Sequence, residues 1–275
     1  MNEASHPGES RIFGLDLMRM LAICLVLHSH TAKFVASPAG TQTALHFFGM
    51  VGVELFFVLS GFLIGSILIR IVDSPEGLTP RSTLMFWIRR WLRTLPNYYL
   101  AFFAFVGVII WVTKVNILHF PDYKRLLYFM ENMTGPPPVL YTIAWSLAVE
   151  EWFYLCFPLV IFPFLLIPRK WRVYAVPLAG LVVVIFSLGL RAYSGWGPHG
   201  DWASVFRKLV PMRVDAIAMG VLAAWIARRF PELWQKWRWL ALLIGLECWL
   251  GYSLTLSGTT CTVARRRLIL HAPCS

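Results

Sequence analysis

An apolar segment near the N-terminus carries charged and imidazole side chains that share one helical face. Residues 16–30 read DLMRMLAICLVLHSH, and each residue of an α-helix turns about 100°. His30 follows Arg19 by about three turns and 20°, so the two lie on one face, which Asp16 joins. His28 projects from the opposite side. An imidazole can transfer protons or bind a metal ion near neutral pH, and His30 is the histidine predicted to act on this face.

The same spacing argues against a metal pair and against direct contact between Arg19 and His30. His28 and His30 diverge by about 200°, whereas metal-binding pairs on helices lie at i and i+4, so no metal site is predicted. The rise from Arg19 to His30 is roughly 16 Å, but Asp16 can pair with Arg19 at i and i+3. The alternative is that Arg19 reaches the lipid headgroups and His30 is a hydrogen-bonded packing residue.

The composition is that of an integral membrane protein. Of the 275 residues, 58% are hydrophobic and only 14% are charged, whereas a soluble domain is about 45–50% apolar and about 25% charged. Aromatic residues, at 15%, suit the membrane–water interface. The net charge of +11 comes largely from basic residues between apolar runs. We therefore expect contact with the lipid bilayer and its anionic headgroups, and no binding of nucleic acid.

Seven apolar segments are long enough to cross a bilayer, which requires roughly 20 residues. They cover about 17–36, 47–69, 95–113, 143–167, 173–190, 209–227 and 238–257. The predicted fold is therefore an all-α transmembrane helix bundle of about seven spans, in one membrane domain over residues 1–258. The basic and aromatic stretch RSTLMFWIRRWLRTLP, which precedes the third span, predicts an amphipathic helix at the membrane surface.

The distribution of lysine and arginine predicts the orientation of the bundle. These residues gather before the first span and in every second loop, so one topology places the N-terminus and all of these loops in the cytoplasm. The tail at residues 259–275 departs from the pattern, because Arg265, Arg266 and Arg267 fall where an outer segment is expected. Either the seventh segment does not cross the membrane, or the tail is atypical through truncation or a frameshift; we expect the atypical tail.

Five stretches, taken in order, resemble acyltransferase family 3, whose members are membrane-bound O-acyltransferases that act on bacterial glycans. They are GLDLMRMLAICLVLHSH (14–30), GVELFFVLSGFLI (52–64), RRWLRTLPNYY (89–99), WSLAVEEWFYLCFP (145–158) and RVDAIAMGVLAA (213–224). The resemblance implies a multi-pass protein of the bacterial cytoplasmic membrane. It also implies transfer of an acyl group, usually acetyl, from acetyl-CoA to a hydroxyl of a cell-surface glycan, with no permanently bound cofactor. Members are usually longer, with more spans.

The resemblance assigns roles to individual residues. The arginine and histidine that the family separates by ten residues fall on Arg19 and His30, and His30 is then the candidate general base for the acceptor hydroxyl. Glu150 or Glu151 would orient the imidazole, as the carboxylate of a catalytic triad does. Three arginines would bind the CoA phosphates through charge-assisted bonds, namely Arg89, Arg90 and Arg93.

Further residues of these blocks are predicted to position the substrate or the helices: Asp16, Arg19, Glu54, Trp145, Ser146, Arg213 and Asp215. Glu54 stands where the family often has aspartate. Ser60 and Gly61 predict close helix packing, and Ser60 is not predicted to be a nucleophile. The three arginines have a purely topological alternative, whereas carboxylates within an apolar segment are costly and usually functional.

Two other functions stay open on the sequence alone. A transporter or proton-relay protein would line a pathway with Arg19, His30, Glu150 and Asp215, although the chain lacks the matched, Gly/Pro-interrupted spans that often mark transporter repeats. A truncated, inactive remnant would fit the unusual tail. The sequence does not fix the acceptor, the acyl chain length, the oligomeric state or the route of the acyl group across the membrane.

Overall fold

The chain folds into a bundle of α-helices, as the sequence predicts. The computed structural model describes residues 13–31, 39–135, 141, 144–194, 208–240 and 243, and this part contains no β-strand. Its elements are α1 (Phe13–Thr31), α2 (Ala39–Asp73), α3 (Pro80–Thr113), η2 (Ile117–His119), α4 (Pro121–Leu126), α5 (Trp145–Ile161), η4 (Phe162–Leu166), η5 (Arg169–Tyr174), α6 (Ala175–Ser194) and α7 (Val210–Arg229).

Six helical segments of the described part are long and apolar enough to cross a membrane: Phe13–Thr31, Phe48–Asp73, Pro80–Thr113, Trp145–Leu166, Arg169–Ser194 and Val210–Arg229. They coincide with the first six predicted spans, so the chain is a multi-pass membrane protein. The seventh predicted span, 238–257, lies mostly outside the described residues, and the tail at 259–275 lies entirely outside them.

One boundary differs from the prediction. The expected surface helix and the third span form a single helix, α3, which begins with Pro80 after a capping box made by Thr79 and Ser82. Buried residues stand on both sides of Pro96, with Phe86 before it and Tyr98 and Phe102 after it, and the helix continues through the exposed proline. At 1.5 Å per residue α3 is about 51 Å long, which exceeds the roughly 30 Å of a bilayer core.

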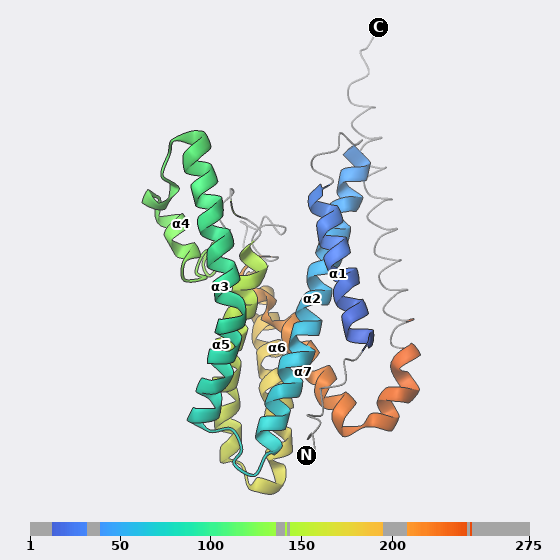
Figure 1. The fold of residues 1–275 in the computed structure, drawn as a ribbon. Coiled ribbons are helices and arrows are strands. Elements are labelled where there is room, and N and C mark those ends of the chain that lie inside the picture. Colours follow the sequence, from blue (N-terminus) through green and yellow to red (C-terminus); the bar gives the residue numbers. More distant parts are fainter. Residues whose placement is uncertain are drawn as a thin grey trace, which may run out of the picture.

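Helix α2 lies between α1 and α7, and α6 packs on α7 (Figure 1). Helices α2 and α7 run in the same direction, because Glu54 pairs with Arg213 and, further along both helices, Asp73 pairs with Arg228. The end of α2, the start of α3 and the turn between α5 and α6 lie together at the lower end of the bundle in Figure 1. Every second loop therefore lies at the same end of the bundle, as the arginine distribution predicts. Which end faces the cytoplasm stays a prediction.

At the upper end, the segment after α3 folds back onto the bundle. The hydroxyls of Tyr98 and Tyr99 donate to the carbonyls of Leu126 and Leu127, each at 2.8 Å. The side-chain amide of Asn132 donates to the carbonyls of Trp145 at 3.0 Å and Lys208 at 2.6 Å. These bonds tie the segment to α3, to the start of α5 and to the chain that enters α7.

Glu131, in this folded-back segment, is a buried carboxylate. It is 3% exposed, and neither carboxylate oxygen makes a hydrogen bond of ordinary geometry within the described residues. Burial raises the pKa of Glu131 from 4.5 to about 7, because removal from water disfavours the charged form. Between pH 4.5 and about 7, the Glu131 carboxyl is therefore protonated in the folded chain and ionised in the unfolded chain.

Because the pKa of Glu131 is raised in the folded state, its contribution to stability is fully present below pH 4.5 and is lost as the pH rises through 7. We expect Glu131→Gln to remove this loss, raising the free energy of unfolding at pH 8 by up to about 3 kcal/mol relative to the parent. Melting temperatures of the detergent-purified chain at pH 5 and pH 8 would measure the effect. The exposed Glu76→Gln is the control, and equal pH dependence in the parent and Glu131→Gln would contradict the expectation.

Candidate active site

The two predicted carboxylates of α5 enter a polar cluster inside the bundle. Tyr154 lies one turn after Glu150 on α5 and donates its hydroxyl to the Glu150 carboxylate at 3.0 Å. The same hydroxyl meets that of Ser60 on α2. Polar groups within a membrane bundle are costly unless they bond to one another, and this chain of three side chains therefore ties α2 to α5.

Helix α3 adds a cation to this cluster. The partly buried Arg90 lies close enough to Glu150, Glu151 and Tyr154 to interact with each electrostatically. The indole of Trp87, one turn before Arg90, donates to the main-chain carbonyl of Tyr154 at 3.0 Å and fixes α3 against α5. The site therefore combines one guanidinium, two carboxylates and two hydroxyls from three helices.

Glu151 lies on the α3 side of the cluster. Its side chain is 5% exposed and faces Thr94 and Arg90. Neither of its oxygens makes a hydrogen bond of ordinary geometry within the part of the chain that the structure describes. A buried carboxylate with spare acceptor capacity can take up a substrate donor group or a further cation.

The three arginines predicted to act together do not share one environment. Arg90 faces α5, while Arg89 and Arg93 are exposed. The charge of Arg93 acts on Arg90, and the Arg90 guanidinium lies 5.9 Å from the ring centroid of Phe86. Helical position separates Arg89 from Arg90, because adjacent residues project about 100° apart, whereas Arg93 lies about one turn beyond Arg90 on nearly the same face. Only Arg90 reaches the buried carboxylates.

Helix α1 carries the predicted base. It is one continuous helix from Phe13 to Thr31, and Asp16 and Arg19 pair at 3.3 Å as the spacing predicts. His30 is partly buried, whereas His28 is exposed. The difference follows from the packing of α1, whose face with Ala22 and Ser29 is buried against α2.

His30 lies at a different level of the bundle from the hydroxyls of Ser60 and Tyr154. Its neighbour Ser29 abuts Gly49 of α2, and Ser60 lies eleven residues further along α2, about 16 Å at 1.5 Å per residue. The structure thus groups the carboxylates with Ser60 and Arg90, and it groups His30 with the upper part of α2. Orientation of His30 by Glu150 or Glu151 stays a prediction.

The predicted R-x-D residues of α7 make two separate ion pairs. Arg213 pairs with Glu54 of α2, and Asp215 pairs with Arg191 of α6. Residues two apart on a helix diverge by about 200°, so the two charges pair with different helices, although the charge of Asp215 also acts on Arg213. Removing one partner from such a pair leaves an uncompensated charge, which makes both pairs structural supports of the bundle.

A family comparison identifies the chain. A model for an acyltransferase domain, that of acyltransferase family 3, matches residues 12–260. The chain belongs to acyltransferase family 3. It is 33% identical over 162 residues, 53% of this chain, to YrhL of Bacillus subtilis, which is named provisionally as a peptidoglycan O-acetyltransferase. It is 32% identical over 191 residues, 62% of this chain, to the peptidoglycan O-acetyltransferase OatA of Listeria monocytogenes.

A further relative from Staphylococcus aureus, named provisionally as an O-acetyltransferase, is 27% identical over 226 residues, 78% of this chain. The matched regions amount to 23%, 27% and 34% of the YrhL, OatA and Staphylococcus aureus proteins, so the chain spans about a quarter to a third of these family members. No solved structure matches the chain.

Two residues described above, Tyr154 and Arg191, escape the sequence analysis. Tyr154 follows Glu150 by four residues, and this spacing signals a helical pair. Arg191, the partner of Asp215, is recognisable as an arginine within an apolar run. Trp145, which the sequence analysis did predict, packs edge-on against Phe57, with ring centroids 6.0 Å apart, which supports a structural role for it. The described residues contain no group of three His, Cys, Asp or Glu side chains that could hold a metal ion.

Proposed function

We propose that this chain is the membrane part of an O-acyltransferase that moves an acyl group, by default acetyl, from acyl-CoA to a hydroxyl of a cell-surface glycan. The observation that carries the proposal is the partly buried cluster of Arg90, Glu150, Tyr154 and Ser60 in a family-3 bundle. The OatA relative is named for peptidoglycan, so peptidoglycan is the first acceptor to test.

The proposed reaction needs a base, a donor site and support for charge. His30 removes the proton of the acceptor hydroxyl as its oxygen attacks the thioester carbonyl. The carbon–sulfur bond breaks, and CoA leaves as the thiol after taking up the proton from the imidazolium. The exposed Arg89 and Arg93 bind CoA phosphates. The half-buried Arg90 stabilises the negative charge of the neighbouring Glu150 carboxylate.

The proposed orientation places donor and acceptor on opposite sides. The end of α2, the start of α3 and the turn between α5 and α6 form the arginine-rich end of the bundle. This end faces the cytoplasm of a bacterial cell, where acyl-CoA is present, and the end of α1 with His30 lies towards the outer face. The acyl group then crosses part of the bundle during the reaction. The partly buried polar cluster lies at an intermediate level along α2, between the arginine-rich end and His30. In this proposal it lines the path of the CoA arm, whose thioester reaches the acceptor hydroxyl at the level of His30.

A proton-relay or transport function is the second candidate. The observation that favours it is the hydrogen-bonded chain from Ser60 through Tyr154 to Glu150 within the bundle, because such chains carry protons in pumps and transporters. Proton flux into vesicles that contain the purified chain, measured without acyl-CoA, distinguishes this function from acyl transfer.

We expect membranes that contain the chain to transfer label from radioactive acetyl-CoA into a peptidoglycan fraction. Glu150→Gln should lower this transfer at least tenfold, because an amide cannot provide the negative charge that faces Arg90. The exposed Glu76→Gln should leave it unchanged. Protein amounts and melting temperatures are compared in parallel. Absence of transfer to every glycan fraction by a folded parent chain would overturn the proposal.

A further inference from the structure

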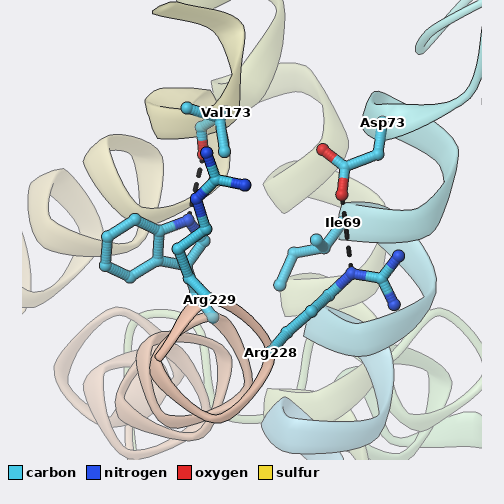
Figure 2. Close-up of a pocket in the computed structure, with 6 residues that line it drawn as sticks. Ile69, Asp73, Val173, Arg228 and Arg229 are labelled. Carbon is cyan, nitrogen blue, oxygen red and sulfur yellow. Dashed lines mark hydrogen bonds and ion pairs between the residues drawn. The ribbon is translucent and has the colours of Figure 1, made fainter. Parts of the chain in front are cut away.

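A second polar site lies at the arginine-rich end of the bundle, away from the proposed active site. A pocket of about 300 Å³ opens between the ends of α2 and α7 and helix η5 (Figure 2). Its lining consists of Ile69, Asp73, Val173, Trp225, Arg228 and Arg229. Asp73 lies thirteen residues beyond Ser60 on α2, about 20 Å along the helix, so this pocket is separate from the cluster around Glu150.

The pocket has an excess of positive charge. Figure 2 shows the two arginines leaving α7 in different directions, Arg228 towards Asp73 and Arg229 towards Val173. Nε of Arg228 lies 3.5 Å from the Asp73 carboxylate, which leaves the two terminal nitrogens for another anion. Arg229 makes no ion pair within the described part of the chain. Two arginines and one aspartate therefore give the lining a net charge of +1.

One wall of the pocket is apolar and rigid. Ile69 is 4% exposed, and the Trp225 indole donates its N–H to the carbonyl of Val173 at 3.0 Å. The Trp225 ring also packs against Tyr174 and Phe230, with centroids 5.9 and 5.6 Å away. Since the indole N–H already has its acceptor, the ring offers an apolar surface to a ligand in the pocket. The ligand therefore needs both an anionic and an apolar part.

The position of the pocket narrows the choice of ligand. It lies where three helical elements reach the membrane surface, beside the exposed basic residues Lys170 and Arg172 of η5. Basic pockets between membrane helices at such a surface bind lipid headgroups, and guanidinium groups bind phosphate oxygens in bidentate fashion. A soluble phosphate ester shares the anionic group but does not need the wall of Ile69 and Trp225.

We propose that this pocket binds the phosphate group of an anionic phospholipid, held by Arg228 and Arg229, with the adjoining apolar part of the lipid against Ile69 and Trp225. Asp73 holds Arg228 at the pocket. A lipid bound there joins the ends of α2 and α7 to η5 and stabilises the arginine-rich end of the bundle. This site is independent of the proposed acyl transfer.

The test is a titration of the full, detergent-purified chain with phosphatidylglycerol, with the melting temperature as readout. We expect phosphatidylglycerol to raise the melting temperature of the parent more than phosphatidylcholine does. Arg229→Gln should increase the half-effective phosphatidylglycerol concentration about tenfold, as expected for loss of one charge-assisted contact. The control Arg172→Gln removes an equal charge at the same end without altering the pocket lining, and should keep the parental value.

Three outcomes would overturn the proposal. The first is an equal phosphatidylglycerol response in the parent, Arg229→Gln and Arg172→Gln. The second is an equal loss in both variants, which would show an effect of net charge alone. The third is a response to inorganic phosphate or free CoA equal to the response to phosphatidylglycerol, which would assign the site to a soluble phosphate ester. If Arg229→Gln does not fold, Arg229→Lys keeps the charge without the bidentate geometry and should give an intermediate increase.

Discussion

Replacing His30 with alanine should lower acetyl transfer by about 100- to 10,000-fold, the range of a lost general base, whereas His28→Ala should keep most of the activity. Both histidines lie in the last turn of α1, so the two variants remove the same type of side chain from neighbouring positions. His30 is partly buried and His28 is exposed. The comparison therefore tests which face of α1 carries the chemistry. Label transferred from radioactive acetyl-CoA to peptidoglycan is the measurement.

The interpretation depends on equal folding of the two variants. Size-exclusion profiles and melting temperatures of both purified chains are compared with those of the parent, because the partly buried His30 borders the α1 face with Ala22 and Ser29 that packs against α2. An equal loss of transfer in His28→Ala and His30→Ala would contradict the prediction that only the α1 face with His30 takes part in catalysis. Full activity of a folded His30→Ala would exclude this residue as the base.

The sequence predicts well those features that depend on one helix at a time. Apolar run lengths locate the six candidate spans, and the 100° rotation per residue places Asp16 and Arg19 in contact. The same rule separates partly buried His30 from exposed His28. These features follow from helical geometry and from the cost of exposing polar groups to lipid, and both can be evaluated from the sequence.

Features that depend on two helices are harder to predict from the sequence. Glu54 and Arg213 are both apparent as charges in apolar segments, but their pairing requires that α2 and α7 run side by side in the same direction. Arg90 is distinguished from Arg89 only by the position of α5. The continuity of α3 through Pro96 is likewise not evident from the sequence. Helical periodicity contains no information on which helices are adjacent.

The close contact between α2 and α7 leads to the largest expected effect on folding. A Cβ atom at Gly61 would overlap the main-chain carbonyl of Ile217, and one at Gly220 would overlap that of Val58. Backbone atoms cannot move aside as a flexible side chain can, so Gly61→Ala would have to separate the two helices. Overpacking usually costs about 1–3 kcal/mol; here we expect Gly61→Ala to lower the free energy of unfolding by more than about 3 kcal/mol.

Gly107→Ala is the matched control, because a Cβ atom at Gly107 of α3 would have nothing within 4 Å of it, and alanine favours a helix by about 0.5–1 kcal/mol. The free energies of unfolding of the two variants, purified in detergent and followed by circular dichroism, are compared with that of the parent. Separation of α2 from α7 would displace Ser60, the neighbour of Gly61, from Tyr154, and Glu54 from Arg213. Gly61→Ala should therefore disturb both the polar cluster around Glu150 and the ion pair of Glu54 with Arg213. If Gly61→Ala were as stable as Gly107→Ala, the two helices would not meet at Gly61.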